Sequence, residues 1–163
     1  MSYPPIRYAG DHGTASGWIR SADSEPDLLI GTRTEVTHLA TGATTGGDFG
    51  LYRWVMTGEP TGPEPHFHRT MTESFYVLEG SIRLFDGARW LDGRPGDFLH
   101  VPPGGVHAFR NDSGARASML LLFTPGAPRE AYFAELAEIV ATGRTMSEED
   151  WADVYARHDQ VPA

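Results

Sequence analysis

Residues 66–73, His-Phe-His-Arg-Thr-Met-Thr-Glu, decide how this chain of 163 residues is interpreted. Successive side chains of an extended strand point to opposite faces, so His66 and His68 project from the same face and form a chelate. Glu73 adds an anionic oxygen, and His107, which follows a Pro- and Gly-rich turn, adds a third imidazole. This donor set suits one divalent first-row transition metal, namely iron, manganese, nickel, cobalt or zinc. The stretch therefore predicts a metal site.

Composition and charge narrow the classes of partner. Apolar residues make up 40% of the chain, and no apolar run approaches the roughly 18–20 residues of a membrane-spanning helix. The net charge of −9 repels phosphate backbones, so nucleic acid is not expected as a partner. The chain has no cysteine, which excludes disulfides and thiolate metal sites. The first residues lack the pattern of a secretory signal. We therefore expect a cytoplasmic protein with no membrane partner.

Turn signals divide the middle of the chain into many short apolar runs. These runs predict strands at residues 28–31, 35–40, 49–57, 73–78, 81–85, 89–91, 97–101, 107–111 and 117–124. Short strands at this spacing favour a sandwich or barrel over alternating βαβ units. We therefore expect one β domain over residues 28–125. Residues 1–27 are rich in Gly, Pro, Ser and Asp and predict an irregular arm that packs over the domain or a neighbouring subunit.

Residues 126–163 change to helical periodicity. A first helix is expected after Pro128, with Gly143 as its stop. Ser147 is followed by three acidic residues, a pattern typical of an N-cap and first turn, and it predicts a second helix. The simplest role for these helices is to cover an open end or edge of the β domain.

Two strings of residues carry a resemblance to a known superfamily. Residues 66–80 read H-x-H-x4-E-x6-G, and residues 96–111 read G-x5-P-x-G-x2-H-x3-N. These strings closely resemble the two conserved motifs of the cupin superfamily, and they occur in the family's order. The departure is at the front, where the family's first motif opens with a glycine and this chain has Pro60, with its nearest glycine at Gly62. That glycine belongs to a turn, so the departure bears on the turn and not on the ligands.

The resemblance implies an all-β fold, a double-stranded β-helix (cupin or jelly-roll) barrel followed by C-terminal helices. It also implies that His66, His68, Glu73 and His107 are the metal ligands, inside the barrel near one mouth. The sequence after residue 125 resembles small single-barrel cupins of actinobacterial type, some of which are quercetin (flavonol) dioxygenase-like. Small cupins often dimerise, so the resemblance also implies a homodimer.

Three functions remain open for such a site. In the first, the metal brings an enolisable aromatic, flavonol-like substrate to dioxygen, and Glu73 takes the substrate's hydroxyl proton as general base. In the second, the same centre performs non-redox cyclisation or isomerisation, as in cupins of the polyketide cyclase type. In the third, the protein binds a small molecule without catalysis. The ligands are common to all three, and we favour the dioxygenase.

The expected barrel interior is apolar and aromatic, which favours a flat hydrophobic ligand over a sugar phosphate. The residues expected to form the substrate pocket are Tyr52, Trp54, Met56, Phe75 and Phe109. Arg53 and Arg83 are candidate anchors for an anionic substrate if either side chain points inward.

Overall fold

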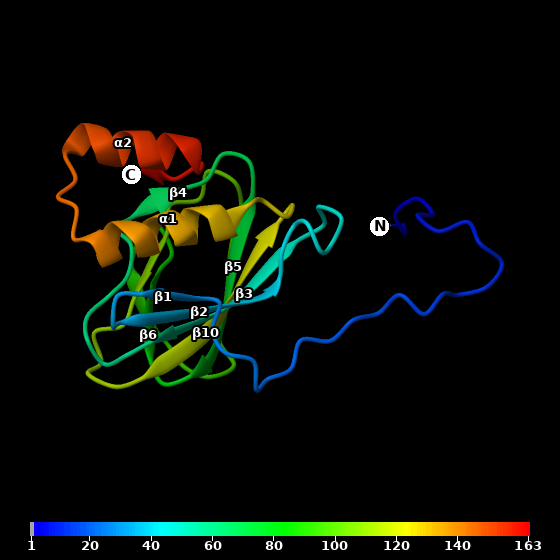
Figure 1. The fold of residues 1–163 in the computed structure, drawn as a ribbon, viewed down its shortest axis with the longest axis horizontal. Coiled ribbons are helices and arrows are strands. Elements are labelled where there is room, and N and C mark those ends of the chain that lie inside the picture. Colours follow the sequence, from blue (N-terminus) through cyan, green and yellow to red (C-terminus); the bar gives the residue numbers. More distant parts are fainter. Residues whose placement is uncertain (1) are drawn as a thin grey trace.

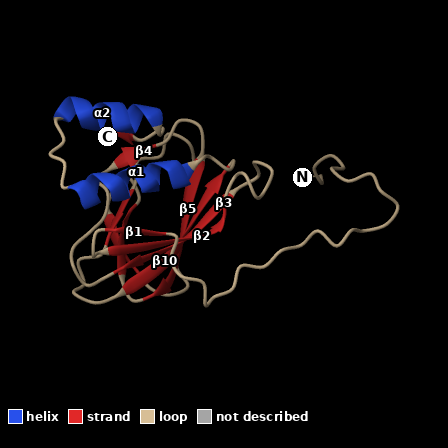
Figure 2. Cartoon of the chain, viewed as in Figure 1, coloured by secondary structure: helices blue, strands red, loops and turns tan. Residues whose placement is uncertain are grey.

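The computed structural model describes residues 2–163, and antiparallel strands form a double-stranded β-helix with two helices at one end (Figures 1 and 2). The larger sheet contains six strands, in the order β1 (Leu28–Ile30), β2 (Thr34–Ala40), β3 (Gly50–Met56), β10 (Ala117–Thr124), β5 (Thr72–Glu79) and β8 (Phe98–Val101). A second sheet contains β7 (Trp90–Gly93), β6 (Ile82–Phe85) and β9 (Ala108–Arg110). A two-stranded pair joins β11 (Val161–Pro162) to β4 (His66–Phe67). The predicted fold class is confirmed.

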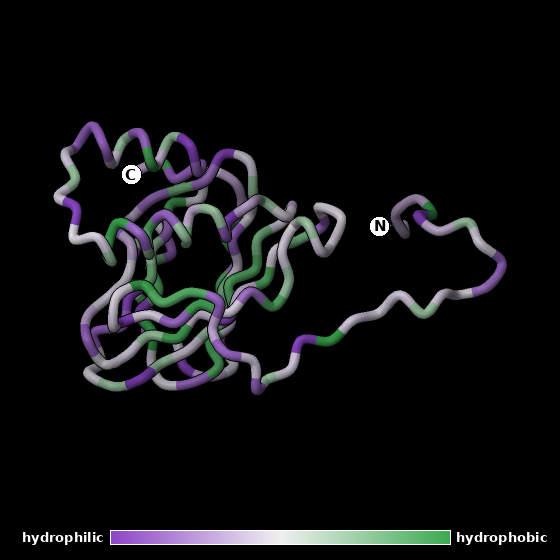
Figure 3. The backbone as a smooth tube through the Cα atoms, viewed as in Figure 1, coloured by the Kyte–Doolittle hydropathy of each residue, from purple (hydrophilic) through white to green (hydrophobic). Residues whose placement is uncertain are grey.

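Alternation along the strands builds the core. On β10, the centre of the larger sheet, Met119, Leu121 and Phe123 are buried, while the residues between them are partly exposed. Figure 3 shows apolar segments gathered along the strands of the barrel. Because strand side chains alternate between faces, one face of each sheet supplies the interior.

Glycines hold the turns that the two motifs require. Gly80 has φ +72°, and a Cβ there would lie 2.5 Å from the carbonyl oxygen of Arg116. Gly104 has φ +81° and donates its N–H to the carbonyl of His68 at 2.7 Å. L-residues rarely adopt positive φ, so the glycine at each turn is a backbone requirement.

Strand-like pairing extends beyond both ends of β9, at His107 and at Asn111. His66 and His107 exchange backbone hydrogen bonds of 3.0 and 2.8 Å, and Thr61 pairs with Asn111 in the same way. Residues directly opposite in an antiparallel pair project their side chains to the same face. Strand pairing therefore places the His66 and His107 rings side by side.

The two predicted helices form. Helix α1 (Arg129–Thr142) ends at Gly143, which has the left-handed φ of +62°, and helix α2 (Glu148–Arg157) begins after a capping box between Ser147 and Asp150. Neither helix is long and apolar enough to span a membrane. In Figure 1 both lie at one end of the barrel, with the chain's C-terminus beside them.

The arm preceding β1 leaves the domain. Residue 1 of the predicted arm lies outside the described residues, and residues 2–27 contain no helix or strand. Figure 1 shows this segment extending away from the barrel, and an ion pair of 2.6 Å joins Arg7 to Asp48. Its apolar side chains are exposed, including Tyr3, Ile6, Tyr8, Trp18 and Ile19. That the arm packs on a neighbouring subunit, and the division of the chain at residues 27 and 125, stay predictions.

Candidate metal centre

The four residues expected to bind a metal meet between the two sheets. Glu73 comes from β5 of the larger sheet, His66 from β4, and His107 from the segment that precedes β9. His66, His68, Glu73 and His107 are all buried, and one ligand atom from each lies within 4.8 Å of the others. Donors bonded to one ion at about 2.1 Å are at most about 4.2 Å apart, so small side-chain movements complete a coordination sphere.

Backbone carbonyls orient all three imidazoles. The Nδ1 atom of His66 lies 2.8 Å from the carbonyl oxygen of Glu64, and that of His107 lies 2.9 Å from the carbonyl oxygen of Gly105. The Nδ1 atom of His68 lies 2.5 Å from the carbonyl oxygen of Asp159. A carbonyl accepts only from a protonated Nδ1, which leaves Nε2 of the neutral ring with a lone pair for a metal.

Those Nε2 atoms converge on the carboxylate. Glu73 Oε2 lies 2.9 Å from Nε2 of both His68 and His107. A lone pair on each nitrogen would repel the oxygen, so this geometry requires a proton or a metal cation between them. Three imidazoles and one carboxylate, with tautomers already set, fit a divalent transition metal.

Burial and the mutual contacts shift the pKa values of these groups. Burial alone would raise the pKa of Glu73, but hydrogen bonds from His107 and His68 hold it below its usual range. Burial lowers the pKa of His66 to about 4, partly opposed by Glu73. Burial also lowers the pKa of His107, yet its hydrogen bond to Glu73 outweighs this and raises it. These contacts therefore favour the ionised form of the Glu73 carboxylate and the protonated form of His107.

The C-terminal segment contributes to this centre, which the sequence did not indicate. Asp159, whose carbonyl faces His68, has the left-handed φ of +51°. Its carboxylate accepts from the backbone N–H groups of Arg69 and Thr70 at 2.9–3.0 Å and from the Thr70 hydroxyl at 2.7 Å. Asp159 thus ties the chain after α2 to the loop that carries His68.

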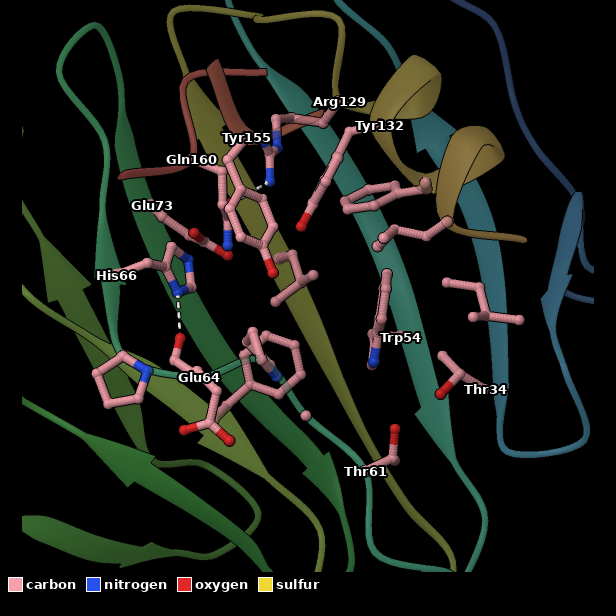
Figure 4. Close-up of a pocket in the computed structure, with 18 of the residues that line it drawn as sticks. Thr34, Trp54, Thr61, Glu64, His66, Glu73, Arg129, Tyr132, Tyr155 and Gln160 are labelled. Carbon is pink, nitrogen blue, oxygen red and sulfur yellow. Dashed lines mark hydrogen bonds between the residues drawn. The ribbon is translucent and has the colours of Figure 1, made fainter. Parts of the chain in front are cut away.

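A cavity of about 320 Å³ opens from the metal centre toward the helices (Figure 4). Of the four candidate ligands, His66 and Glu73 lie on its wall, whereas His68 and His107 are outside its lining. Apolar and aromatic side chains supply most of the remaining lining, among them Ile30, Trp54, Phe109, Leu121, Tyr132, Phe133, Leu136, Trp151 and Tyr155. The barrel, α1, α2 and the C-terminal residues therefore enclose it jointly.

The structure places the five expected pocket residues at different depths. Trp54 and Phe109 line the cavity, whereas Tyr52, Met56 and Phe75 are fully buried in the core and lie outside its lining. Strand parity turns all five inward, but parity does not tell how far along the barrel the cavity extends.

Neither arginine considered as an anion anchor reaches the cavity. Arg53 is absent from the lining, and Arg83 pairs with Asp92 at 3.4 Å and Asp112 at 3.9 Å. The arginine on the cavity wall is Arg129, at the start of α1. It was not singled out from the sequence, since a charged residue in a first helical turn is usually exposed.

Comparison with known proteins agrees with this architecture. Residues 54–123 match the family model of the cupin domain. A segment of 48 residues is 46% identical to quercetin 2,3-dioxygenase of Bacillus subtilis (strain 168), and it amounts to 29% of this chain and 14% of that protein.

Solved structures with a similar fold come from several bacteria. A predicted oxalate decarboxylase of Thermotoga maritima gives a TM-score of 0.59 at 17% identity, covering 67% of this chain and 99% of that one. KdgF from Halomonas sp. gives 0.58 at 15% identity, covering 67% and 93%. The polyketide cyclase RemF of Streptomyces resistomycificus gives 0.55 at 22% identity, covering 66% and 78%. The double-stranded β-helix, both sequence motifs and the match of residues 54–123 together identify a cupin domain in this chain.

Proposed function

We propose that this protein is a metal-dependent enzyme that acts on a flat, enolisable aromatic small molecule, and that its reaction is a dioxygenation. The observation that carries the proposal is the position of the His66, His68, Glu73 and His107 cluster at the inner end of an aromatic-walled cavity. A buried polar centre at the end of an apolar cavity of a few hundred Å³ is the usual form of a small-molecule site.

In this proposal, residues of the cavity wall bind the substrate, exclude water and accept its proton. A bound divalent metal supplies Lewis acidity that lowers the pKa of a substrate hydroxyl. Glu73 is the buried carboxylate on the cavity wall, so it takes that hydroxyl proton as general base. Trp54 and Phe109 hold a planar ring against the inner wall, while Trp151 and Tyr155 of α2 exclude water from the outer end.

The dioxygenase assignment is supported by the 46% identity over 48 residues to a quercetin 2,3-dioxygenase, although that segment is a small part of the relative. Fold similarity does not discriminate, because the polyketide cyclase RemF shares the barrel. A non-redox cyclase or isomerase reaction at the same centre is therefore the competing outcome that the assay must separate.

The test begins with metal analysis of protein purified without chelators. Oxygen uptake and substrate loss are then followed over a panel of flavonols and related polyphenols, in air and under anaerobic conditions. Oxygen uptake proportional to substrate loss supports the proposal, and equal turnover without oxygen replaces it with the non-redox reaction.

Glu73→Gln is the decisive variant, with Glu79→Gln as its control on the same strand. Glu73 is buried and Glu79 is exposed at the end of β5. We expect Glu73→Gln to lose about 100-fold or more in kcat, the usual contribution of a general base, while Glu79→Gln retains the parent rate. Full activity of a metal-loaded Glu73→Gln protein would contradict the role of Glu73.

A further inference from the structure

Arg129 is a buried cation beside the metal cluster without an acidic partner. Only 4% of its surface is exposed, and within residues 2–163 no carboxylate oxygen lies within 4.0 Å of its guanidinium. Charged side chains are almost never fully buried unless paired, because burial of an isolated ion is unfavourable by several kcal/mol. Its environment therefore requires an explanation.

The contacts that Arg129 does make use only part of its donor capacity. Nη1 donates to the carbonyl of His158 at 2.8 Å, and Nη2 donates to the Gln160 side-chain oxygen at 3.1 Å. Nε is buried with no partner among the described residues. A guanidinium has five N–H groups, so three remain without an acceptor. The rings of Phe123 and Tyr132 lie 5.1 and 4.5 Å from its central carbon and compensate the charge in part.

The charges around the cavity favour an anion. Among the charged residues of its wall, Glu64 is exposed at the surface, which leaves Glu73 and Arg129 in the interior. These two charges cancel, so a divalent metal at the cluster gives the interior a net charge of about +2. An anionic ligand reduces that charge, whereas a neutral ligand leaves it uncompensated.

Further hydrogen-bond donors lie on the same wall. The hydroxyl groups of Tyr132 and Tyr155 make no hydrogen bond to another residue of the described chain, and Figure 4 shows both side chains beside Arg129 and Gln160. Burial raises the pKa of Tyr132, so its hydroxyl stays protonated and is a hydrogen-bond donor for a ligand in the cavity. Arg129, Tyr132 and Tyr155 therefore all line the same cavity, and the first two are buried.

We propose that Arg129 is the anchor for an oxyanion of the substrate, so that the cavity selects flat aromatic anions, with a carboxylate or an ionised hydroxyl, over neutral molecules of the same shape. This inference rests on the proposed function for the identity of the site, but not on oxygen chemistry. Arginine is suited to the role because its planar fork matches the two oxygens of a carboxylate.

The test compares two probes of matched shape. Cinnamate carries an aromatic ring and a carboxylate, and cinnamamide replaces the carboxylate with a neutral amide. Binding of each is measured by quenching of tryptophan fluorescence, because Trp54 and Trp151 line the cavity, and by calorimetry. Both methods are applied to the zinc-loaded protein and to the metal-free protein, so that attraction of the carboxylate to the metal is separated from attraction to Arg129.

The parent protein should bind cinnamate about tenfold or more tightly than cinnamamide, since a hydrogen bond to a charged group contributes about that factor. Arg129→Met should remove the preference in the metal-free protein, and Arg129→Lys should retain part of it. Gln160→Leu is the matched control, because it removes one contact of Arg129 without changing the charge. It should keep the preference.

Equal binding of both probes to the parent, no measurable binding of cinnamate at millimolar concentration, or a preference that survives in metal-free Arg129→Met would each overturn the inference. If Arg129→Met does not fold, the test depends on Arg129→Lys and Gln160→Leu. Loss of the cinnamate preference in Gln160→Leu, together with its full retention in Arg129→Lys, would contradict the binding of the oxyanion by the Arg129 guanidinium. A cinnamate preference in a protein that takes up no oxygen with any polyphenol supports Arg129 while refuting the dioxygenase. Oxygen uptake with a polyphenol, in a protein that does not prefer cinnamate, supports the dioxygenase and refutes the role of Arg129.

Discussion

Replacement of Asp159 by alanine tests whether the C-terminal segment positions a metal ligand. The Asp159 carboxylate holds three donors of the loop that follows His68, and its carbonyl fixes the Nδ1 hydrogen of that histidine. Without the carboxylate, no side-chain hydrogen bond holds residue 159 at a φ of +51°, a conformation that is unfavourable for alanine by about 1–2 kcal/mol. The carbonyl then moves away from His68, whose ring is free to rotate.

Loss of such an outer contact lowers metal affinity by about 10- to 100-fold. This factor corresponds to about 1.4–2.7 kcal/mol, which is comparable with the backbone term alone. Zinc affinity is measured by competition with a chromophoric chelator, and the visible spectrum of the cobalt-loaded protein reports the geometry at His68.

Two further variants identify the cause. Asp159→Gly lacks the carboxylate but tolerates positive φ, so it should lose less affinity than Asp159→Ala. Asp153→Ala removes an exposed carboxylate from α2, the helix that precedes Asp159, and should leave the affinity unchanged. An Asp159→Ala protein that binds zinc within about twofold of the parent, with an unaltered cobalt spectrum, would refute the positioning role.

Three other predictions follow from the same structure. Metal affinity should rise as the pH increases through the raised pKa of His107, since the metal must displace its proton, and binding should release at least one proton per ion. Gly62→Ala should lower the free energy of unfolding by about 1–3 kcal/mol or more, because Gly62 has φ +152° and a Cβ would lie 2.0 Å from the carbonyl oxygen of Phe109. Tyr52→Phe should lower it by about 1.5 kcal/mol, because the hydroxyl donates to a Glu130 carboxylate oxygen at 2.6 Å and that carboxylate can regain water. Urea denaturation measures the last two.

Each of these has a control or a contradicting result. Chelator competition at several pH values that gives a constant affinity between about pH 6 and 8 would contradict the role assigned to His107. Gly13→Ala is matched to Gly62→Ala, since Gly13 lies in the exposed arm with open space around it, and it should not change stability. A Tyr52→Phe protein as stable as the parent would mean that water replaces the hydroxyl contact fully.

The sequence predicted the cluster of four candidate ligands because the relations that define it are local. His66 and His68 are two residues apart on an extended segment, so their side chains share a face, and Glu73 follows after a short spacing. Their convergence with His107 then follows from the antiparallel pairing of the segments that carry the two motifs. The strands and both helices were likewise predictable from periodicity, turn residues and caps. The very short β11 was missed, because two residues carry no periodicity, whereas β4 was expected only from the parity of His66 and His68.

The cavity wall was much less predictable than the ligands. Asp159 lies 91 residues from His68 in the chain, and no spacing rule connects positions so far apart. Arg129 was overlooked for a related reason, since only the packing of α1 on the barrel buries it. Trp151 and Tyr155 are four residues apart, a spacing that places them on one face of α2, but the spacing does not indicate that this face closes a cavity.

The C-terminal segment connects Arg129 with the candidate metal centre through two hydrogen bonds. Arg129 holds the carbonyl of His158, and the next residue, Asp159, holds His68. An anion that draws the Arg129 guanidinium toward the cavity therefore acts on a segment that also orients His68. Because the two contacts share a backbone, the effects of Arg129→Met and Asp159→Ala on zinc affinity should not add, whereas independent sites would give additive free energies. Additivity of the two changes within about 0.5 kcal/mol would mean that the anion anchor and the metal centre operate separately.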